Sequence, residues 1–232
     1  MFYDISYVLL IPAIILTFYA QAKVKSNFNK YSKVRNKRGI TGERAARMVL
    51  DANGLRDIPI VPISGSLTDH YDPKKHTVNL SETVYGQTSI SAIAVACHET
   101  GHAIQHNLEY GPLEFRSTLF PVVRFTSTLS WPIAIIGIVL LGAGSYQLGN
   151  LLFLIGVAFF SLVVLFHLVT LPVEFNASKR ALDQMVDLSI IDEGERTGAK
   201  KVLSAAALTY VAALATALAN LLRLFAMRSR SR

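Results

Sequence analysis

Four long apolar blocks dominate the hydropathy pattern of this chain. They run over Ile5–Ala20, Phe120–Gly144, Leu151–Leu171 and Val202–Leu224. A helix needs about 20 apolar residues to cross a bilayer, so the blocks have the length expected of transmembrane helices. The pattern therefore predicts a multi-pass α-helical membrane protein, with the lipid bilayer as its first partner. A polar break at Tyr146–Asn150 predicts that the second and third blocks form a tight hairpin.

Two more polar stretches, residues 21–118 and residues 172–201, separate these blocks and predict a part outside the bilayer. In the first stretch, Thr41 begins a helical pattern that Gly54 closes, and Ile58–Ile63 reads as a short extended segment. Two further strand patterns flank the turn Asp72–Lys75 and predict a β-hairpin. The strand just before the next helix is a candidate edge for pairing with an extended peptide.

That next helix carries the candidate chemistry. Ser89–Cys97 contains no helix breaker, and the residues that follow it read H-E-x-x-H from His98 to His102. Histidines four apart lie about 6 Å along a helix axis, so both can bind one Zn²⁺. Glu99 lies beside the open face of the metal, where the general base for water belongs. Gly101 lowers helix propensity, which predicts the close approach of a neighbouring element.

A catalytic zinc needs a third protein ligand. The predicted hairpin of blocks two and three returns the chain to the side of His98, and Glu174 is the first candidate after the third block. Asp183 and Asp187 are alternatives, either as ligands or as supporting carboxylates.

Two other arrangements are excluded by spacing. His106 lies about 12 Å along the helix from His98, too far to share a tetrahedral ion with it. The third histidine of the metzincins would fall on Leu108.

The segments Cys97–His106 and Leu171–Leu182 together resemble the YugP-type bacterial family of neutral zinc metallopeptidases, and the resemblance extends over nearly the whole chain. It implies a small α+β gluzincin-like zinc peptidase domain that holds one Zn²⁺ per chain, with Glu99 as the base. The implied zinc ligands are His98, His102 and Glu174.

More distantly, the chain is similar to the HtpX-type membrane gluzincins. Those enzymes carry an aspartate four residues after the ligand glutamate, where this chain has Ser178. Asn176, where the nearer family often has aspartate, can still hydrogen-bond a zinc ligand. His167, two turns before Glu174, is a third candidate for the surroundings of the metal, because ionisable groups inside spans are commonly functional.

Charge predicts the orientation. The formal net charge is +7, and seven basic residues lie between Lys23 and Arg38. The positive-inside rule predicts that this side, and the active site with it, is cytoplasmic at the bacterial inner membrane. The basic runs flank apolar blocks, which favours anionic lipid headgroups over nucleic acid as their partner. No Lys or Arg precedes the first block, which argues against a cleaved signal peptide.

If all four blocks cross the membrane, the C-terminal arginines lie on the side opposite the Lys23–Arg38 cluster, and the positive-inside rule disfavours basic residues there. Either the fourth block does not fully cross, or the N-terminal cluster decides the topology, which is the interpretation we favour. The single cysteine, Cys97, excludes an internal disulfide and is expected in the core.

Two functional classes fit these patterns. The first is a membrane-anchored zinc metalloendopeptidase that hydrolyses polypeptides, with membrane proteins in quality control or processing as the expected substrates. The second is a catalytically silent, zinc-stabilised membrane scaffold or partner subunit, against which the intact Glu99 argues. The sequence leaves the oligomeric state open.

Overall fold

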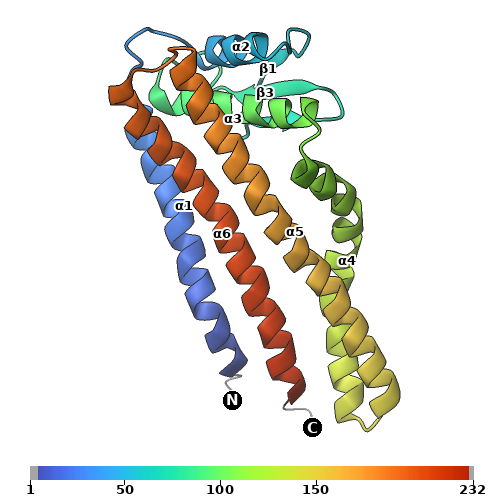
Figure 1. The fold of residues 1–232 in the computed structure, drawn as a ribbon. Coiled ribbons are helices and arrows are strands. Elements are labelled where there is room, and N and C mark those ends of the chain that lie inside the picture. The colour runs from blue at the N-terminus through green and yellow to red at the C-terminus, as the bar shows by residue number, and fades with distance from the viewer. Residues whose placement is uncertain (1–4, 230–232) are drawn as a thin grey trace. The chain divides into compact units, whose positions relative to one another are not determined.

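The computed structural model describes residues 5–229, which are mostly helical and include one small β-sheet. A short 3₁₀ helix (Ile5–Leu10) leads into the first helix. The elements are α1 (Ile11–Tyr31), α2 (Gly42–Ala52), β1 (Ile60–Ile63), β2 (His70–Asp72), β3 (Thr77–Ser81), α3 (Ile90–Asn107), α4 (Gly111–Gly142), α5 (Tyr146–Asp187) and α6 (Glu193–Ser229) (Figure 1).

The chain forms two compact units, and long helices contribute to both. Unit 1 contains the residues up to Tyr19, Glu114–Leu171 and the residues from Thr209 onward. Unit 2 contains Ala20–Leu113 and Pro172–Leu208.

Four helical stretches are long and apolar enough to cross a membrane, as the four apolar blocks predicted. They are Tyr7–Tyr31, Gly111–Gly142, Tyr146–Asp187 and Glu193–Ser229. Each is longer than the block that predicted it because the helix continues into polar sequence.

The turn between α4 and α5 does not lie where the polar break suggested. Residues Tyr146–Asn150 begin α5, so placing the break there was wrong, although the tight connection itself is confirmed. The chain reverses over residues 143–145. Gly144 adopts a φ of 83°, and the N–H of Ser145 donates to the carbonyl of Leu140. A glycine in this left-handed conformation ends a helix without steric cost, which a run of polar residues does not do by itself.

Within unit 1, small residues allow α4 and α5 to pack closely. A Cβ atom on Gly137 would overlap the backbone of Phe153, and one on Gly156 would overlap Ala134. Phe153 is fully buried between these helices. Close packing of this kind is how membrane helices associate when no hydrophobic effect drives them together.

Unit 2 contains the sheet, whose strand order is β1-β3-β2. β2 and β3 are antiparallel and form the predicted hairpin, whereas β1 runs parallel to β3. The strand just before the H-E-x-x-H helix is therefore central, and the prediction that it forms an edge was wrong. The β1 segment occupies its other side, so β1 and β2 are the edge strands.

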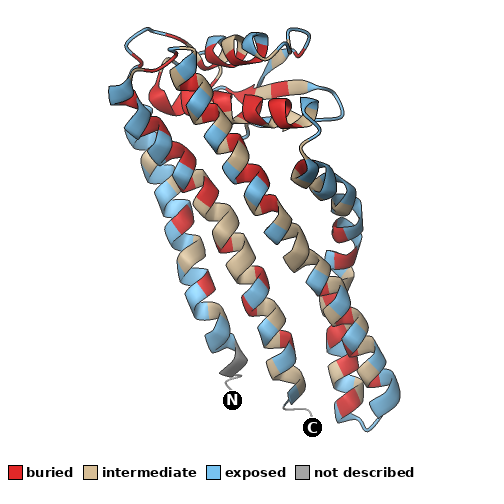
Figure 2. Cartoon of the chain, in the orientation of Figure 1, coloured by how far each residue is buried: buried red, intermediate tan, exposed pale blue. Residues whose placement is uncertain are grey.

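Two capped helices pack against the sheet. Thr41 caps α2 through its side chain, which accepts from the N–H of Arg44, and Ser89 caps α3 by accepting from the N–H of Ala92. Side chains of α2, β3 and α3 form one apolar cluster that includes Leu50, Leu80 and Ala96. Buried residues therefore run along α3 (Figure 2), which fixes its register in unit 2.

The C-terminal part of α5 and the first turns of α6 complete unit 2. Ala181 and Met185 of α5 lie in a second apolar cluster with Ile93 and Cys97 of α3. Cys97 is fully buried there, as predicted, and burial raises the pKa of its thiol well above the usual range. This contact places the residues that follow Pro172 against the helix with the H-E-x-x-H motif.

Candidate metal centre

Two imidazoles and one carboxylate converge between α3 and α5 within unit 2. The Nε2 atom of His98 lies 3.3 Å from an Oε atom of Glu174, and the Nε2 atom of His102 lies 3.5 Å from the same oxygen. The candidate ligand atoms of His98, His102 and Glu174 all lie within 4.8 Å of one another. Two imidazole nitrogens and a carboxylate oxygen are a donor set typical of catalytic zinc sites.

Helix geometry explains why the two histidines face the same way. They are four residues apart on the continuous helix α3, so their side chains project from one face. Glu174 comes from α5, which approaches α3 at Gly101. A Cβ on Gly101 would lie 2.7 Å from the carbonyl oxygen of Ala177, so this helix contact requires glycine. The predicted packing reason for Gly101 is confirmed.

His98 is oriented by a residue of α5. The hydroxyl oxygen of Ser178 lies 3.2 Å from Nδ1 of His98. Ser178 was predicted from its position four residues after Glu174, and it does contact a candidate zinc ligand. One helical turn of α5 therefore supplies both a carboxylate and a hydroxyl to the site.

His102 is oriented through a chain of amides. Its Nδ1 lies 3.0 Å from the Oε1 atom of Gln105, and the side-chain N–H₂ of Gln105 donates to Asn176 at 3.0 Å and to the carbonyl of Val173 at 2.8 Å. Arg180 also donates to Asn176, at 2.7 Å. Asn176, a predicted supporting residue, therefore acts on the histidine through Gln105.

Gln105 is the supporting residue that the sequence reasoning missed. It is fully buried, which is unusual for a glutamine unless its polar atoms are satisfied. Its position three residues after His102 on the same helix face was the signal that could have identified it.

These contacts fix which histidine nitrogen is available to a metal. The Oε1 atom of Gln105 can only accept, because its N–H₂ group points to Val173 and Asn176, so Nδ1 of His102 carries the proton. Nε2 then presents its lone pair toward Glu174. Metal-binding histidines are commonly held in this tautomer by a partner at the other nitrogen. The residues present therefore fit a zinc ion.

Glu99 lies beside this cluster and is only 8% exposed. The backbone N–H of Tyr71 on β2 donates to its carboxylate at 3.0 Å. The pKa of Glu99 is raised to about 7, mainly by burial and also by the carboxylates of Glu174 and Asp69, whereas His98 and the Tyr71 N–H oppose this rise. A carboxyl group with a pKa near neutrality can both accept and return a proton.

Tyr71 is the second residue that the sequence did not identify as part of the site. Its hydroxyl lies 3.0 Å from Nδ1 of His106, and burial raises the pKa of this hydroxyl. The His106 ring also lies 5.1 Å from that of His76, centroid to centroid. No local signal links Tyr71 to Glu99, because the two are brought together by the packing of β2 on α3.

The other candidates lie elsewhere. Asp183 and Asp187 are exposed on α5 and do not belong to the cluster of His98, His102 and Glu174. His167 belongs to unit 1, where its ring packs on Phe166, and its functional role stays a prediction. His70 is exposed and bonds to the carbonyl of Thr68.

Comparison with known proteins identifies the family of this chain. A family model described as "Putative neutral zinc metallopeptidase" matches residues 6–229. The chain is also 54% identical over 215 residues to the "Putative membrane protease YugP" of Bacillus subtilis (strain 168), covering 93% of this chain and 92% of that protein. No solved structure matches the chain. The model match extends over nearly all of the sequence, and the chain therefore belongs to the neutral zinc metallopeptidase family that the H-E-x-x-H helix indicated.

Proposed function

We propose that this protein is a membrane-bound zinc endopeptidase with a gluzincin-like catalytic domain. The observation that carries the proposal is the convergence of His98, His102 and Glu174 beside the buried carboxyl of Glu99. In this assignment the first three residues hold one Zn²⁺ per chain, and Glu99 takes part in the reaction without binding the metal.

Each protein group then has a defined task. When bound, zinc supplies Lewis-acid chemistry: it polarises the peptide carbonyl and makes water easier to deprotonate. Glu99 removes a proton from the attacking water. It returns that proton to the amide nitrogen as the C–N bond breaks, which yields a carboxylic acid and an amine. The N–H of Tyr71 keeps the Glu99 carboxylate aimed at the reacting atoms.

The substrate class follows from the membrane helices. A peptidase held at the bilayer by four spans meets the loops and tails of other membrane proteins at higher effective concentration than free proteins. We therefore propose processing or quality control of membrane proteins as its role. The edge strand β2, which carries Tyr71, is the proposed place for an extended segment of substrate to pair.

Zinc analysis combined with a cleavage assay tests this function. The purified wild type is expected to hold about one zinc per chain and to cleave unfolded casein. Glu99→Gln should retain zinc and lose activity by several orders of magnitude, because an amide cannot accept the proton. Glu82→Gln, at an exposed glutamate, is the matched control and should stay active. Zinc retained without cleavage by the wild type would instead support the silent scaffold.

The orientation is a separate part of the proposal and has its own test. We propose that unit 2 faces the cytoplasm, and the support for this is the basic cluster from Lys23 to Arg38. In intact cells, a membrane-impermeant thiol reagent should leave a cysteine at Lys74 unlabelled and should label one at Gln147, both exposed positions. The buried thiol of Cys97 gives little background. Labelling at Lys74 and protection at Gln147 would reverse the topology.

A further inference from the structure

We infer that a basic pocket of unit 2, between α1 and α6, binds the phosphate-bearing headgroup of an anionic phospholipid. The pocket has a volume of about 560 Å³, within the range of small-molecule sites and larger than an inorganic phosphate needs. Its lining residues are Lys23, Asn27, Thr197, Lys200, Lys201, Ser204, Ala205 and Leu208.

The polar part of this lining has the chemistry of an anion site. Lys23, Lys200 and Lys201 supply three ammonium groups, and the lining contains no carboxylate. The hydroxyls of Thr197 and Ser204 can donate to phosphate oxygens. Charge-assisted hydrogen bonds from ammonium groups to phosphate are about twice as strong as bonds between neutral groups.

The position of the pocket along the chain selects a lipid over a soluble phosphate. Lys23 follows the first apolar block closely, and Lys200 and Lys201 directly precede the fourth. Ammonium groups at the ends of apolar spans lie at the depth of the headgroups. Ala205 and Leu208, one and two turns further along α6, give the pocket an apolar end. A free phosphate has nothing to place there, whereas a phospholipid has its glycerol and acyl carbons.

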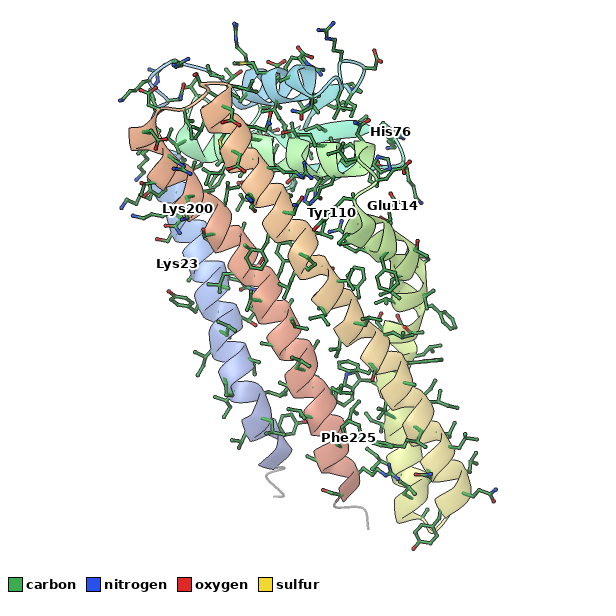
Figure 3. The ribbon with its side chains drawn as sticks, viewed as in Figure 1. Lys23, His76, Tyr110, Glu114, Lys200 and Phe225 are labelled. Atoms are coloured by element: carbon green, nitrogen blue, oxygen red, sulfur yellow. The ribbon has the colours of Figure 1, made fainter. Side chains whose placement is uncertain are left out.

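One contact within the lining and one beyond it hold α1 and α6 together and so shape the pocket. The side-chain amide of Asn27 donates to the carbonyl of Lys201 at 3.2 Å. Further along, a Cβ on Gly198 would lie 2.8 Å from the ring of Tyr31, so the helices make close contact there. Figure 3 shows Lys23 on α1 and Lys200 on α6 at this junction. The pocket is therefore built by the fold and does not need a ligand to form.

The test compares lipid affinities of the full chain in an uncharged detergent by native mass spectrometry. The probes are phosphatidylglycerol and phosphatidylcholine with identical acyl chains. Lys200→Gln/Lys201→Gln should weaken phosphatidylglycerol binding by about thirty-fold, since each Lys near an anionic lipid surface contributes about a five-fold factor. Lys25→Gln/Lys33→Gln removes the same charge from exposed positions outside the pocket and should change it by less than about three-fold.

A second variant separates the pocket from its charge. Ser204→Leu keeps all three lysines but puts a larger side chain into the pocket lining, and it should also weaken phosphatidylglycerol binding while helical content stays at the wild-type level. Equal losses in the two double variants would mean diffuse surface attraction and would overturn the inference, as would unchanged binding in Lys200→Gln/Lys201→Gln. Displacement of the lipid by an equal concentration of inorganic phosphate would make the ligand a free phosphate instead.

Discussion

The candidate metal centre and the α4–α5 hairpin differ in how their hydroxyl and amide side chains are bonded. In unit 2, the side chains around the site bond across elements: Ser178 of α5 contacts His98 of α3, and Gln105 of α3 donates to Asn176 of α5. In unit 1, several hydroxyls of α4 and α5 bond within their own helix. Ser130 donates to the carbonyl of Ser127, and Ser161 donates to that of Val157.

This difference follows from the surroundings of each region. A membrane-spanning helix must satisfy its own polar groups because lipid offers no partner, and its helices then meet through small residues such as Gly137 and Gly156. The metal centre needs directional contacts to hold two imidazoles and a carboxylate at one point. Substitutions should therefore disturb the metal centre through specific bonds and the hairpin mainly through volume.

The largest effect expected in the metal centre is the loss of a ligand. Glu174→Ala removes one of three candidate ligands and should weaken zinc binding by more than the 10- to 100-fold typical of a supporting residue. Zinc content after dialysis against a graded chelator measures this. His106→Ala is the control, because His106 bonds to Tyr71 and lies outside the ligand cluster. Zinc kept in Glu174→Ala but lost in His106→Ala would reverse the assignment.

A smaller effect is expected where α3 meets α5. Gly101→Ala adds a Cβ that would lie 2.7 Å from the carbonyl oxygen of Ala177, and the helices must separate to accommodate it. Overpacking of this kind costs about 1–3 kcal/mol of stability. Thermal unfolding in detergent should show a clearly lower midpoint for this variant. Gly86→Ala adds the same methyl group where no atom lies within 4 Å and should leave the midpoint unchanged. Equal midpoints for both variants would contradict the packing argument.

The sequence predicted those parts of the fold that depend on local signals. The apolar blocks, the start of α2 after Thr41 and the β2–β3 hairpin are each encoded within one continuous stretch of sequence, and the structure contains all of them. Non-local features were harder to predict. The central position of β3 depends on pairing with β1, a segment more than a dozen residues earlier in the chain.

The same limit applies to the candidate site. The spacing of His98 and His102 on one helix predicts that they share a face, and the geometry agrees. Glu174 was identified through the returning hairpin and the family resemblance, and the packing at Gly101 brings it within reach. Tyr71 could not be predicted, because its bond to Glu99 joins a strand to a helix by tertiary packing alone. The catalytic and metal-binding roles of these residues stay predictions until they are measured.

The two histidine supports should differ in strength, and this refines the comparison within the metal centre. Gln105→Ala removes the partner of His102 and the bonds that Gln105 donates to the Val173 carbonyl and to Asn176, which keeps its donor Arg180. We expect zinc affinity to fall toward the upper end of the 10- to 100-fold range. Ser178→Ala removes one longer contact to His98, and its loss of zinc affinity should lie at the lower end of that range. Chelator competition measures both. A larger loss of zinc affinity in Ser178→Ala would mean that the hydrogen bonds of Gln105 with His102 and Asn176 support the fold and not the metal site.

The smallest effect tests the comparison directly, because α5 offers the same substitution in both regions. Ser161→Ala removes a hydroxyl that is exposed in unit 1 and bonds to the preceding turn of its own helix. Its loss leaves no cross-helix partner unsatisfied, so unfolding stability should change by less than about 0.5 kcal/mol and zinc affinity should not change. Ser178→Ala, one turn after Glu174 on the same helix, removes a cross-helix contact and should lower zinc affinity measurably. Parallel chelator titrations of the two variants decide the matter. Equal zinc affinities would show that the contact across helices contributes no more to the metal centre than a hydroxyl that serves its own helix.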